Sequence, residues 1–273
     1  MNYETFLPHQ DLRSFVKCFW TLEVPANESS ARQRILPDGC IELFFILGDD
    51  IKRFTSEEEF IIQPREMVLG QITRPYFIQP AGYVHSFAVR FYPYGFANLV
   101  TVPLDQLADT ETPLAQLFGE ETAGQLSQGI ISAAGTPQRI QIMENFLLDS
   151  IQHKVTIDHI VKSTVDALIA TNGSQPIHAI LKAQLSKRRQ LERKFIKQIG
   201  ISPKQLGKVI RLQAVLKMIL DQPSGQLTNI AYEGEYHDQA HFIKDFKEFT
   251  GASPRHFLCD SAMALSAALY AKG

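Results

Sequence analysis

The sequence has few cysteines and no long apolar run, and both shortages exclude classes of protein. Its 273 residues include three cysteines, Cys18, Cys40 and Cys259, which lie far apart and form no Cys-x-x-Cys pair. A scattered, odd set of this kind predicts neither a disulfide framework nor a zinc site and is typical of a reducing compartment. The longest apolar stretches, residues 43–47 and 262–271, are too short to span a bilayer, and no secretion signal opens the chain. We expect a cytoplasmic protein without a membrane partner.

Motifs of the common enzyme classes are also missing. Gly200 and Gly207-Lys208 do not have the spacing of a phosphate-binding loop. His9 and His85 lack the spacing of a metal-binding pair. The sequence contains no nucleophile elbow, zincin motif or dinucleotide fingerprint. We therefore expect no catalytic residue, no metal and no cofactor, and a function other than that of an enzyme.

The small overall charge conceals a division of the chain. The net charge is −2, but residues 174–258 hold 14 Lys and Arg against 7 Asp and Glu, a net of +7. The remainder holds 13 basic and 22 acidic residues, a net of −9. Such a division is expected when one half of a chain meets a polyanion and the other half does not.

Residues 12–100 have the pattern of short β-strands. Apolar residues alternate with polar or exposed-looking ones along 16–24 and again along 85–92, and residues 41–47 form an apolar run that carries Glu42. Turn residues separate these runs. We predict an α+β multidomain protein whose residues 1–103 form a β-barrel or sandwich of cupin-like type.

Helical spacing replaces this pattern from about Leu104. Two apolar stripes stand at helical spacing within the predicted helical region 104–172: Ile140, Met143, Leu147 and Ile151, then Ile157, Ile160, Val161, Val165 and Leu168. These stripes fit either a dimerisation surface or the packing of domains, and we favour packing. Residues 171–174 form the expected break before the basic part.

A short motif occurs twice in the basic part. Gly200-Ile201-Ser202-Pro203 returns 51 residues later as Gly251-Ala252-Ser253-Pro254, and Phe195 and Phe246 precede the two copies at the same distance. A repeat of this length indicates a duplicated helical unit. The sequence thus predicts an all-α domain built from two similar units.

Each predicted unit is a pair of helices. The first has Ile177, Ile180 and Leu181 on one helix, a turn near 185–186, and a second helix over 187–198 whose apolar face holds Leu191, Phe195 and Ile199. The second unit repeats this with Leu227, Ile230 and Ala231, then a helix over 238–250 that buries Phe242 and Phe246.

A connecting helix is predicted between the two units. It runs over 203–221, with Ser202 as its N-cap and Pro203 at its first position. It spans roughly 28 Å at 1.5 Å per residue, close to the ~34 Å between successive major grooves of DNA.

These residues together resemble the DNA-binding domain of the AraC/XylS family of transcription regulators. The resemblance covers about 177–258 and is carried by Arg189-x-Leu191-x-Arg193-x-Phe195, Gly200-x-Ser202-Pro203, Ile230-Ala231, Asp238-Gln239-x-His241-Phe242-x-Lys244-x-Phe246-Lys247 and Gly251-x-Ser253-Pro254. It implies two helix-turn-helix motifs over 173–258 that bind double-stranded operator DNA, and a companion domain that senses an effector or dimerises. RNA polymerase is a further candidate partner.

The N-terminal part resembles an uncharacterised β domain found ahead of such regulators. The resemblance rests on residues 37–43, 70–75 and 89–93. Residues 259–273 form a separate tail with a short expected helix and no assigned role.

Several residues depart from the AraC/XylS pattern. Leu181 replaces a usual Ala, Leu185 a usual Gly, and Lys187 a small N-cap. Glu235 replaces a turn Gly and Ala240 a common Ser. Because glycine relieves a positive φ in such turns, we expect the first turn to be remodelled, with Ser186 as a candidate cap, and the second turn to borrow flexibility from Gly234.

The two second helices supply the candidate DNA contacts. The candidates for base contact are Arg188, Arg189, Glu192, Gln239 and Ala240, since Arg pairs with guanine, Glu accepts from cytosine and Gln pairs with adenine. The alternative is a plain ion pair of Arg188 or Arg189 with Glu192 on a solvated helix. The candidates for the phosphate backbone are Lys187, Arg193, Lys197, Lys244 and Lys247. His241 fits packing better than base contact.

The β region supplies candidates for an effector pocket. Trp20, Glu42, His85 and Arg90 lie on the predicted strands and are the residues that would converge on a small ligand. The competing interpretation is that Trp20 fills the core and Arg90 balances Glu42 or Asp38. Asp38 lies in Pro-Asp-Gly, which is typical of a turn.

The leading hypothesis is a sequence-specific transcription regulator with an N-terminal sensing or dimerising part. One rival is an N-terminal ligand-binding or enzymatic module with secondary DNA binding. Another is a regulator controlled by a protein partner rather than a small molecule.

Overall fold

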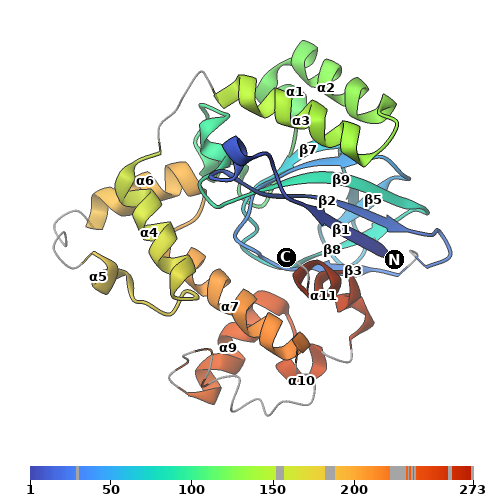
Figure 1. Cartoon of the computed structure of the whole chain (residues 1–273). Coiled ribbons are helices and arrows are strands. Elements are labelled where there is room, and N and C mark those ends of the chain that lie inside the picture. The colour runs from blue at the N-terminus through green and yellow to red at the C-terminus, as the bar shows by residue number, and fades with distance from the viewer. Residues whose placement is uncertain are drawn as a thin grey trace.

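Two antiparallel sheets, stacked on each other, form the N-terminal part of the chain (Figure 1). The computed structural model describes residues 1–28, 31–151, 157–181, 188–221, 232, 234, 236, 238–257 and 260–271. The strands are β1 (Asn2–Phe6), β2 (Val16–Val24), β3 (Gln33–Ile35), β4 (Glu42–Ile46), β5 (Ile51–Phe54), β6 (Phe60–Ile62), β7 (Glu66–Leu69), β8 (Tyr76–Pro80), β9 (Val84–Phe91) and β10 (Glu111–Pro113).

The larger sheet has the order β1-β2-β9-β4-β7-β10 and the smaller one β3-β8-β5-β6. The predicted β architecture is confirmed in its sandwich form, since the described strands make two sheets instead of one closed barrel. Strand β10 lies beyond residue 103, where we placed the end of the β part.

The larger sheet is buried on both faces, which corrects the expected alternation of buried and exposed residues. Phe19, Phe87 and Val89 lie in a core on the outer face of the sheet. Trp20 and Ala88, which occupy the alternate positions, lie in a second core between the sheets. Side chains on both faces of the larger sheet are therefore apolar or paired, because each face is covered by another layer.

Three helices cover the outer face of the larger sheet: α1 (Leu114–Phe118), α2 (Glu120–Ser132) and α3 (Thr136–Ile151). On α3, Met143 and Leu147 are fully buried in the core beneath the helices, with Ile140 and Ile151 partly buried beside them. This confirms that the first apolar stripe packs inside the chain.

The second stripe lies on α4 (His159–Ala170) and packs against the basic part. Val161, Val165 and Leu168 share a core with Leu191 and Phe195. Helix α4 therefore belongs to the packing of the first helical unit, although the sequence placed it before that unit.

The basic part is helical, as predicted. Its helices are α5 (Ile177–Ile180), α6 (Arg188–Ile199), α7 (Pro203–Asp221), α9 (Gln239–Thr250) and α10 (Pro254–Phe257). Helix α11 (Ala264–Ala271) follows in the tail, and short 3-10 helices occupy Gln10–Leu12, Phe96–Asn98, Leu104–Leu107 and Ser261–Met263. Every helix within the described ranges is too short or too polar to cross a membrane.

The duplicated motif forms the same structure twice. Gly200 and Gly251 end α6 and α9 in the left-handed region, at φ values of 96° and 71°. Ser202 and Ser253 then cap the next helices, through hydrogen bonds to the amides of Gln205 and His256. Glycine is required at both ends because a Cβ disfavours this backbone conformation.

Some predicted features lie outside the described residues. These are Leu185, Ser186, Lys187, Glu235, Cys259 and the first helix of the second unit with Leu227, Ile230 and Ala231. Leu181 also departs from the family pattern but is described, and it is buried in the core that α4 shares with α6.

Candidate DNA-binding face and ligand cavity

Helix α6 buries one face and exposes another, as its sequence predicts. Leu191, Phe195 and Ile199 are fully buried, while Arg189 and Arg193 are exposed. The candidates Arg188 and Lys197 are exposed as well. Nε of Arg188 lies 3.3 Å from Oε1 of Glu192 one turn later, so this pair forms the surface ion pair that was the alternative to base contact.

Helix α9 has the same division. Phe242 and Phe246 are fully buried, and the candidates on the exposed face are Gln239, Ala240, Lys244 and Lys247. Asp238 caps the helix by accepting from the amide of His241 at 2.7 Å. His241 also packs edge-on against Tyr236, which agrees with its predicted packing role.

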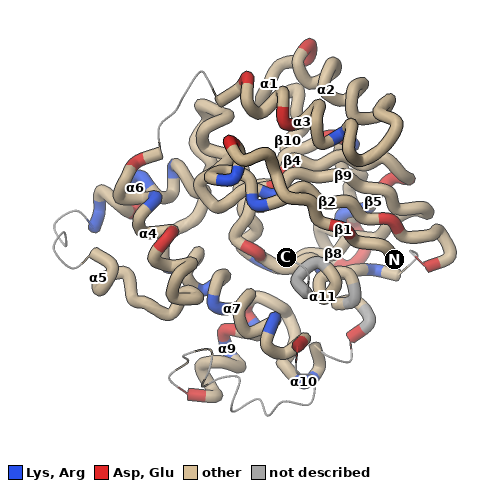
Figure 2. The backbone as a smooth tube through the Cα atoms, in the orientation of Figure 1, with Lys and Arg blue, Asp and Glu red and all other residues tan. Residues whose placement is uncertain are grey.

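A groove of about 650 Å³ separates the two helices. Arg188 and Glu192 of α6 line it on one side, and His241 and Asp245 of α9 line it on the other. Its floor is α7, and Figure 2 shows Lys and Arg along α6 and α7. Helices α6 and α9 thus lie on opposite sides of the basic helix α7.

Three basic residues on α7 were missed by the sequence analysis. Lys204, Lys208 and Arg211 line the groove floor at i, i+4 and i+7. Lys208 bridges Asp245 of α9 at 3.1 Å, and Arg211 donates to the carbonyl of Gly173 at 2.9 Å. The spacing placed them on one face of the helix, which is the signal that could have identified them.

Helix α6 is also tied to α4. The Lys194 ammonium donates to the carboxylate of Asp158, the N-cap of α4. This hydrogen bond lowers the pKa of Asp158. The exposed face of α6 is therefore held in place from behind by a helix that the family motif does not include.

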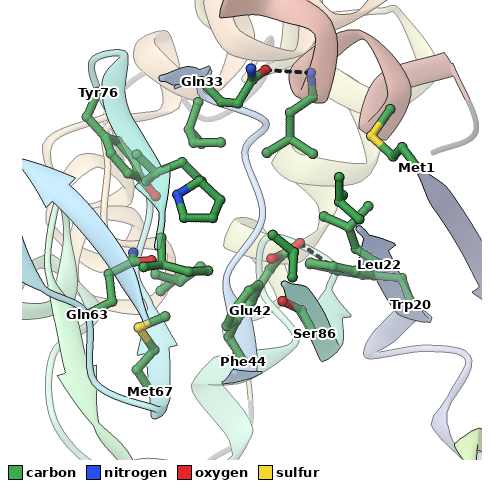
Figure 3. Close-up of a pocket in the computed structure, with 18 of the residues that line it drawn as sticks. Met1, Trp20, Leu22, Gln33, Glu42, Phe44, Gln63, Met67, Tyr76 and Ser86 are labelled. Atoms are coloured by element: carbon green, nitrogen blue, oxygen red, sulfur yellow. Dashed lines mark hydrogen bonds between the residues drawn. The ribbon is translucent and has the colours of Figure 1, made fainter. Parts of the chain in front are cut away.

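The second site is a cavity of about 240 Å³ between the two sheets (Figure 3). Its wall is mainly apolar, with side chains from both sheets, among them Leu22, Phe44, Met67, Ile78 and Val84. Trp20 and Glu42, two of the four predicted pocket residues, line it. Gln63, Tyr76 and Ser86 are polar lining residues that the sequence analysis did not identify.

A buried hydrogen-bond network forms one wall of the cavity. Oε1 of Glu42 accepts from Nε1 of Trp20 at 3.1 Å and from Nε of Arg90 at 2.6 Å. Burial raises the pKa of Glu42, although Arg90 opposes this. Burial by itself would lower the pKa of Arg90, but Glu42 and Asp38 raise it well above its ordinary value. Arg90 therefore stays charged behind Glu42.

Asp38 serves both the turn and this network. Its Oδ1 accepts from the amide of Cys40 at 2.9 Å, which is the turn that Pro-Asp-Gly predicts. Its Oδ2 lies 3.5 Å from Nε of Arg90. The interpretation that Arg90 balances Glu42 or Asp38 holds for both acids.

His85, the fourth predicted pocket residue, lies apart from the cavity lining. Its Nε2 is 3.5 Å from Nη1 of Arg139 on α3 and 3.7 Å from Oε1 of Glu23. Burial lowers the pKa of His85, and the charge of Arg139 lowers it further. Because successive side chains on β9 point to opposite faces, His85 faces α3 while its neighbour Ser86 faces the cavity. In the part of the chain that the structure describes, no cluster of three metal-ligating side chains occurs.

Two family models match the chain. Residues 182–259 match a family described as a helix-turn-helix domain, and residues 4–113 match a domain of unknown function (DUF6597). The chain carries an AraC-type helix-turn-helix domain. Comparison with curated proteins found no matching sequence.

Solved structures of ToxT from Vibrio cholerae are similar to this chain. One ToxT structure matches at a TM-score of 0.50 and 10% identity, over 97% of this chain and 100% of that chain. A second, bound to (E)-4-(8-methylnaphthalen-1-yl)but-3-enoic acid, matches at a TM-score of 0.48 and 12% identity, over 95% and 99% of the two chains. The arrangement of an antiparallel β part, intervening helices and an AraC-type domain is thus a known one.

The AraC-type domain accounts for the duplicated units but not for the whole C-terminal part. Its family model ends at residue 259, so α11 lies beyond it. The cavity, for its part, lies between strands of the region that matches the domain of unknown function.

Proposed function

We propose that this protein is a cytoplasmic, sequence-specific DNA-binding regulator of transcription in which α6 and α9 enter successive major grooves of one duplex. One observation carries the proposal. Helices α6 and α9 have buried apolar faces and exposed basic faces, each is followed by a glycine with positive φ, and the 19-residue helix α7 lies between them in the chain. A rigid connection of roughly 28 Å suits the ~34 Å repeat of the major groove.

The exposed residues divide into two roles. Arg193, Lys197, Lys244 and Lys247 bind phosphates, which take half or more of the hydrogen bonds in protein–DNA complexes. Arg188, Arg189, Glu192, Gln239 and Ala240 face the base edges. Arg188 and Glu192 already form an ion pair, so their base contact requires that pair to open.

The cavity between the sheets receives a small effector in this proposal. Its apolar wall with a few polar groups is typical of ligand sites. Dimerisation and contact with RNA polymerase are further roles that the β part and the exposed helices would serve.

Charge reversal tests the DNA-binding role. We expect Arg193→Glu with Lys244→Glu to weaken binding to every duplex sequence and to make the dependence of affinity on salt less steep. Fluorescence anisotropy with labelled duplexes over a range of salt concentrations measures both. Lys52→Glu on β5 is the matched control, since it reverses a charge in the β part. Unchanged affinity in the double variant would refute the placement of α6 and α9 on DNA.

A further inference from the structure

The tail beyond the AraC-type domain is packed on the wall of the cavity. Leu265 of α11 lines the cavity and lies in the same core as Trp20 and Ile78. Its amide donates to Oε1 of Gln33 at 3.1 Å, and Gln33 is itself a lining residue, as Figure 3 shows. The cavity is therefore made by both ends of the chain.

Strand β3 connects this wall to the second helical unit. Next to Gln33, Arg34 donates to the carbonyl of Thr250, the last residue of α9, at 3.0 Å. The same Nη1 lies 3.6 Å from Oδ2 of Asp260 in the tail. Two residues further on, Leu36 is fully buried in the core of the second unit, beside Met263 of the tail and Phe249 of α9. Four consecutive residues thus run from the cavity to the end of a DNA-binding helix.

The chemistry of the wall defines what it can hold. Among the described lining residues, the acids are Glu28 and Glu42, and the cation is the terminal ammonium of Met1, which Glu28 holds at 3.1 Å. Ser86 is 1% exposed and its Oγ has no hydrogen-bond partner. The buried hydroxyl can donate or accept a hydrogen bond, whereas the carboxylate oxygens of Glu42 only accept. The wall therefore suits a ligand that carries a hydrogen-bond donor.

The volume of the cavity and the charges in its wall restrict the class of ligand further. An apolar cavity of about 150 Å³ holds benzene, and this one is larger, at about 240 Å³. An anionic ligand would meet no unpaired cation in this poorly solvated wall, because Arg90 is paired with Glu42 and the Met1 ammonium with Glu28.

We propose that the cavity takes a neutral, mainly apolar molecule larger than benzene that donates a hydrogen bond, and that its occupancy holds α11, and with it the second DNA-binding unit, against the β part. The inference rests on the proposed role of the cavity as an effector site. Coupling between the ligand and the tail works in both directions, because linkage is reciprocal. A ligand in contact with Leu265 stabilises the docked tail, and loss of the docked tail lowers the affinity of the cavity for the ligand.

A pair of fluorescent probes with one skeleton tests the ligand class in the full chain. N-phenyl-1-naphthylamine is neutral and carries one N–H donor, whereas 8-anilinonaphthalene-1-sulfonate adds a negative charge. We expect the neutral probe to bind and the sulfonate to bind at least tenfold more weakly. Equal binding of the two would overturn the ligand class. Ser127→Ala, a buried serine on α2 away from the cavity, is the control that should leave both affinities unchanged.

Two variants test the tail. Asp260→Asn weakens the contact with Arg34 without touching the cavity lining, and a chain that ends at residue 259 removes α11 but keeps the whole helix-turn-helix match. We expect the neutral probe to bind a few-fold more weakly to the first variant and at least tenfold more weakly to the second. In the wild-type chain, hydrogen exchange should slow over 260–271 when the probe is added and stay unchanged over 120–132.

The outcomes separate this inference from the function on which it rests. If neither probe bound to any form of the chain, the proposed effector site itself would be contradicted. If the neutral probe bound equally to the full and shortened chains and hydrogen exchange in the tail did not slow, only the proposed role of the tail would be contradicted. Tighter binding to the shortened chain would show that Leu265 blocks the cavity. Finally, the probe should change duplex affinity in the wild-type chain and not in the shortened one. An equal change in both would place the coupling elsewhere.

Discussion

Glu42 and Arg90 occupy directly paired positions on the neighbouring strands β4 and β9, and their side chains meet at 2.6 Å in the interior of the protein. Both residues are at most 8% exposed. The pair is therefore a buried ion pair that closes one wall of the cavity and leads toward the turn at Asp38.

Breaking this pair should be costly. We expect Arg90→Ala to reduce the free energy of unfolding by about 3–5 kcal/mol, because it leaves the carboxylate of Glu42 buried without its cationic partner. Urea denaturation measures the loss. The double variant Arg90→Met with Glu42→Leu should lose less than Arg90→Ala.

The control is an exposed pair in the same domain. Arg65 lies 2.8 Å from Asp50, and both side chains are about half exposed. We expect Arg65→Ala to change the unfolding free energy by about 1 kcal/mol or less. A loss for Arg90→Ala that did not exceed this control would contradict the structural role of the buried pair.

Arg189 should determine sequence preference, not general affinity. We expect Arg189→Ala to cost about 1–3 kcal/mol on the preferred duplex and to relax selection at one base pair, as loss of a bidentate contact with guanine does. Selection of binding sites from random duplexes, followed by affinity measurement, tests this. An equal loss on random DNA would mean that Arg189 touches phosphate only.

Two glycines in helical surroundings should respond in opposite directions. Gly251 has a φ of 71°, and the atoms nearest to a Cβ there would be those of the Arg34 side chain, at 3.7 Å or beyond, and Pro75, at 3.9 Å. We expect Gly251→Ala to lower stability by about 1 kcal/mol through backbone strain alone.

Gly124 supplies the comparison, since it lies within α2 and a Cβ there would meet nothing within 4 Å. We expect Gly124→Ala to raise stability by about 0.5–1 kcal/mol, because alanine restricts the unfolded chain and favours the helix. Thermal unfolding of the two variants measures both changes. A stabilising Gly251→Ala would show that the backbone there is not held in the left-handed region.

His85 should make stability depend on pH. Its pKa in the folded protein lies below the ordinary value of 6.5, first because of burial and then because of Arg139. Below about pH 6.5 the unfolded chain takes up a proton that the folded protein resists, so this contribution to stability is full above that pH and is lost as the pH falls. Urea midpoints at pH 7.5 and 5.5 should differ less in His85→Gln than in the wild-type protein. The same difference in both would mean that Glu23 compensates the effect of burial.

The helical half of the protein was accessible to sequence reasoning because its signals are local. The span of α7 and the buried faces of α6 and α9 follow from the spacing of apolar residues within each helix, and the two glycine ends follow from a short repeated motif. Capping by Ser202 and Ser253 is equally local, since each serine binds an amide three residues later.

The β half was less accessible because burial on both faces removes the alternation that reveals a strand's orientation. Ser86, Ala88 and Arg90 face the space between the sheets and are buried, so nothing in their order shows which residues line a cavity. For the same reason, His85 was grouped with Trp20 and Glu42 although it faces α3.

The amino-acid sequence by itself determined the duplicated helical unit, its connecting helix and the charge that suits DNA, because neighbouring residues define helix faces and helix ends. Only the tertiary structure decided that Glu42 meets Arg90, that α4 braces α6, and that α11 lies on a cavity formed by strands from the start of the chain, where Leu265 meets Gln33 across a separation of 232 residues. Contacts of that kind depend on how separate layers pack, and no pattern within one segment records them.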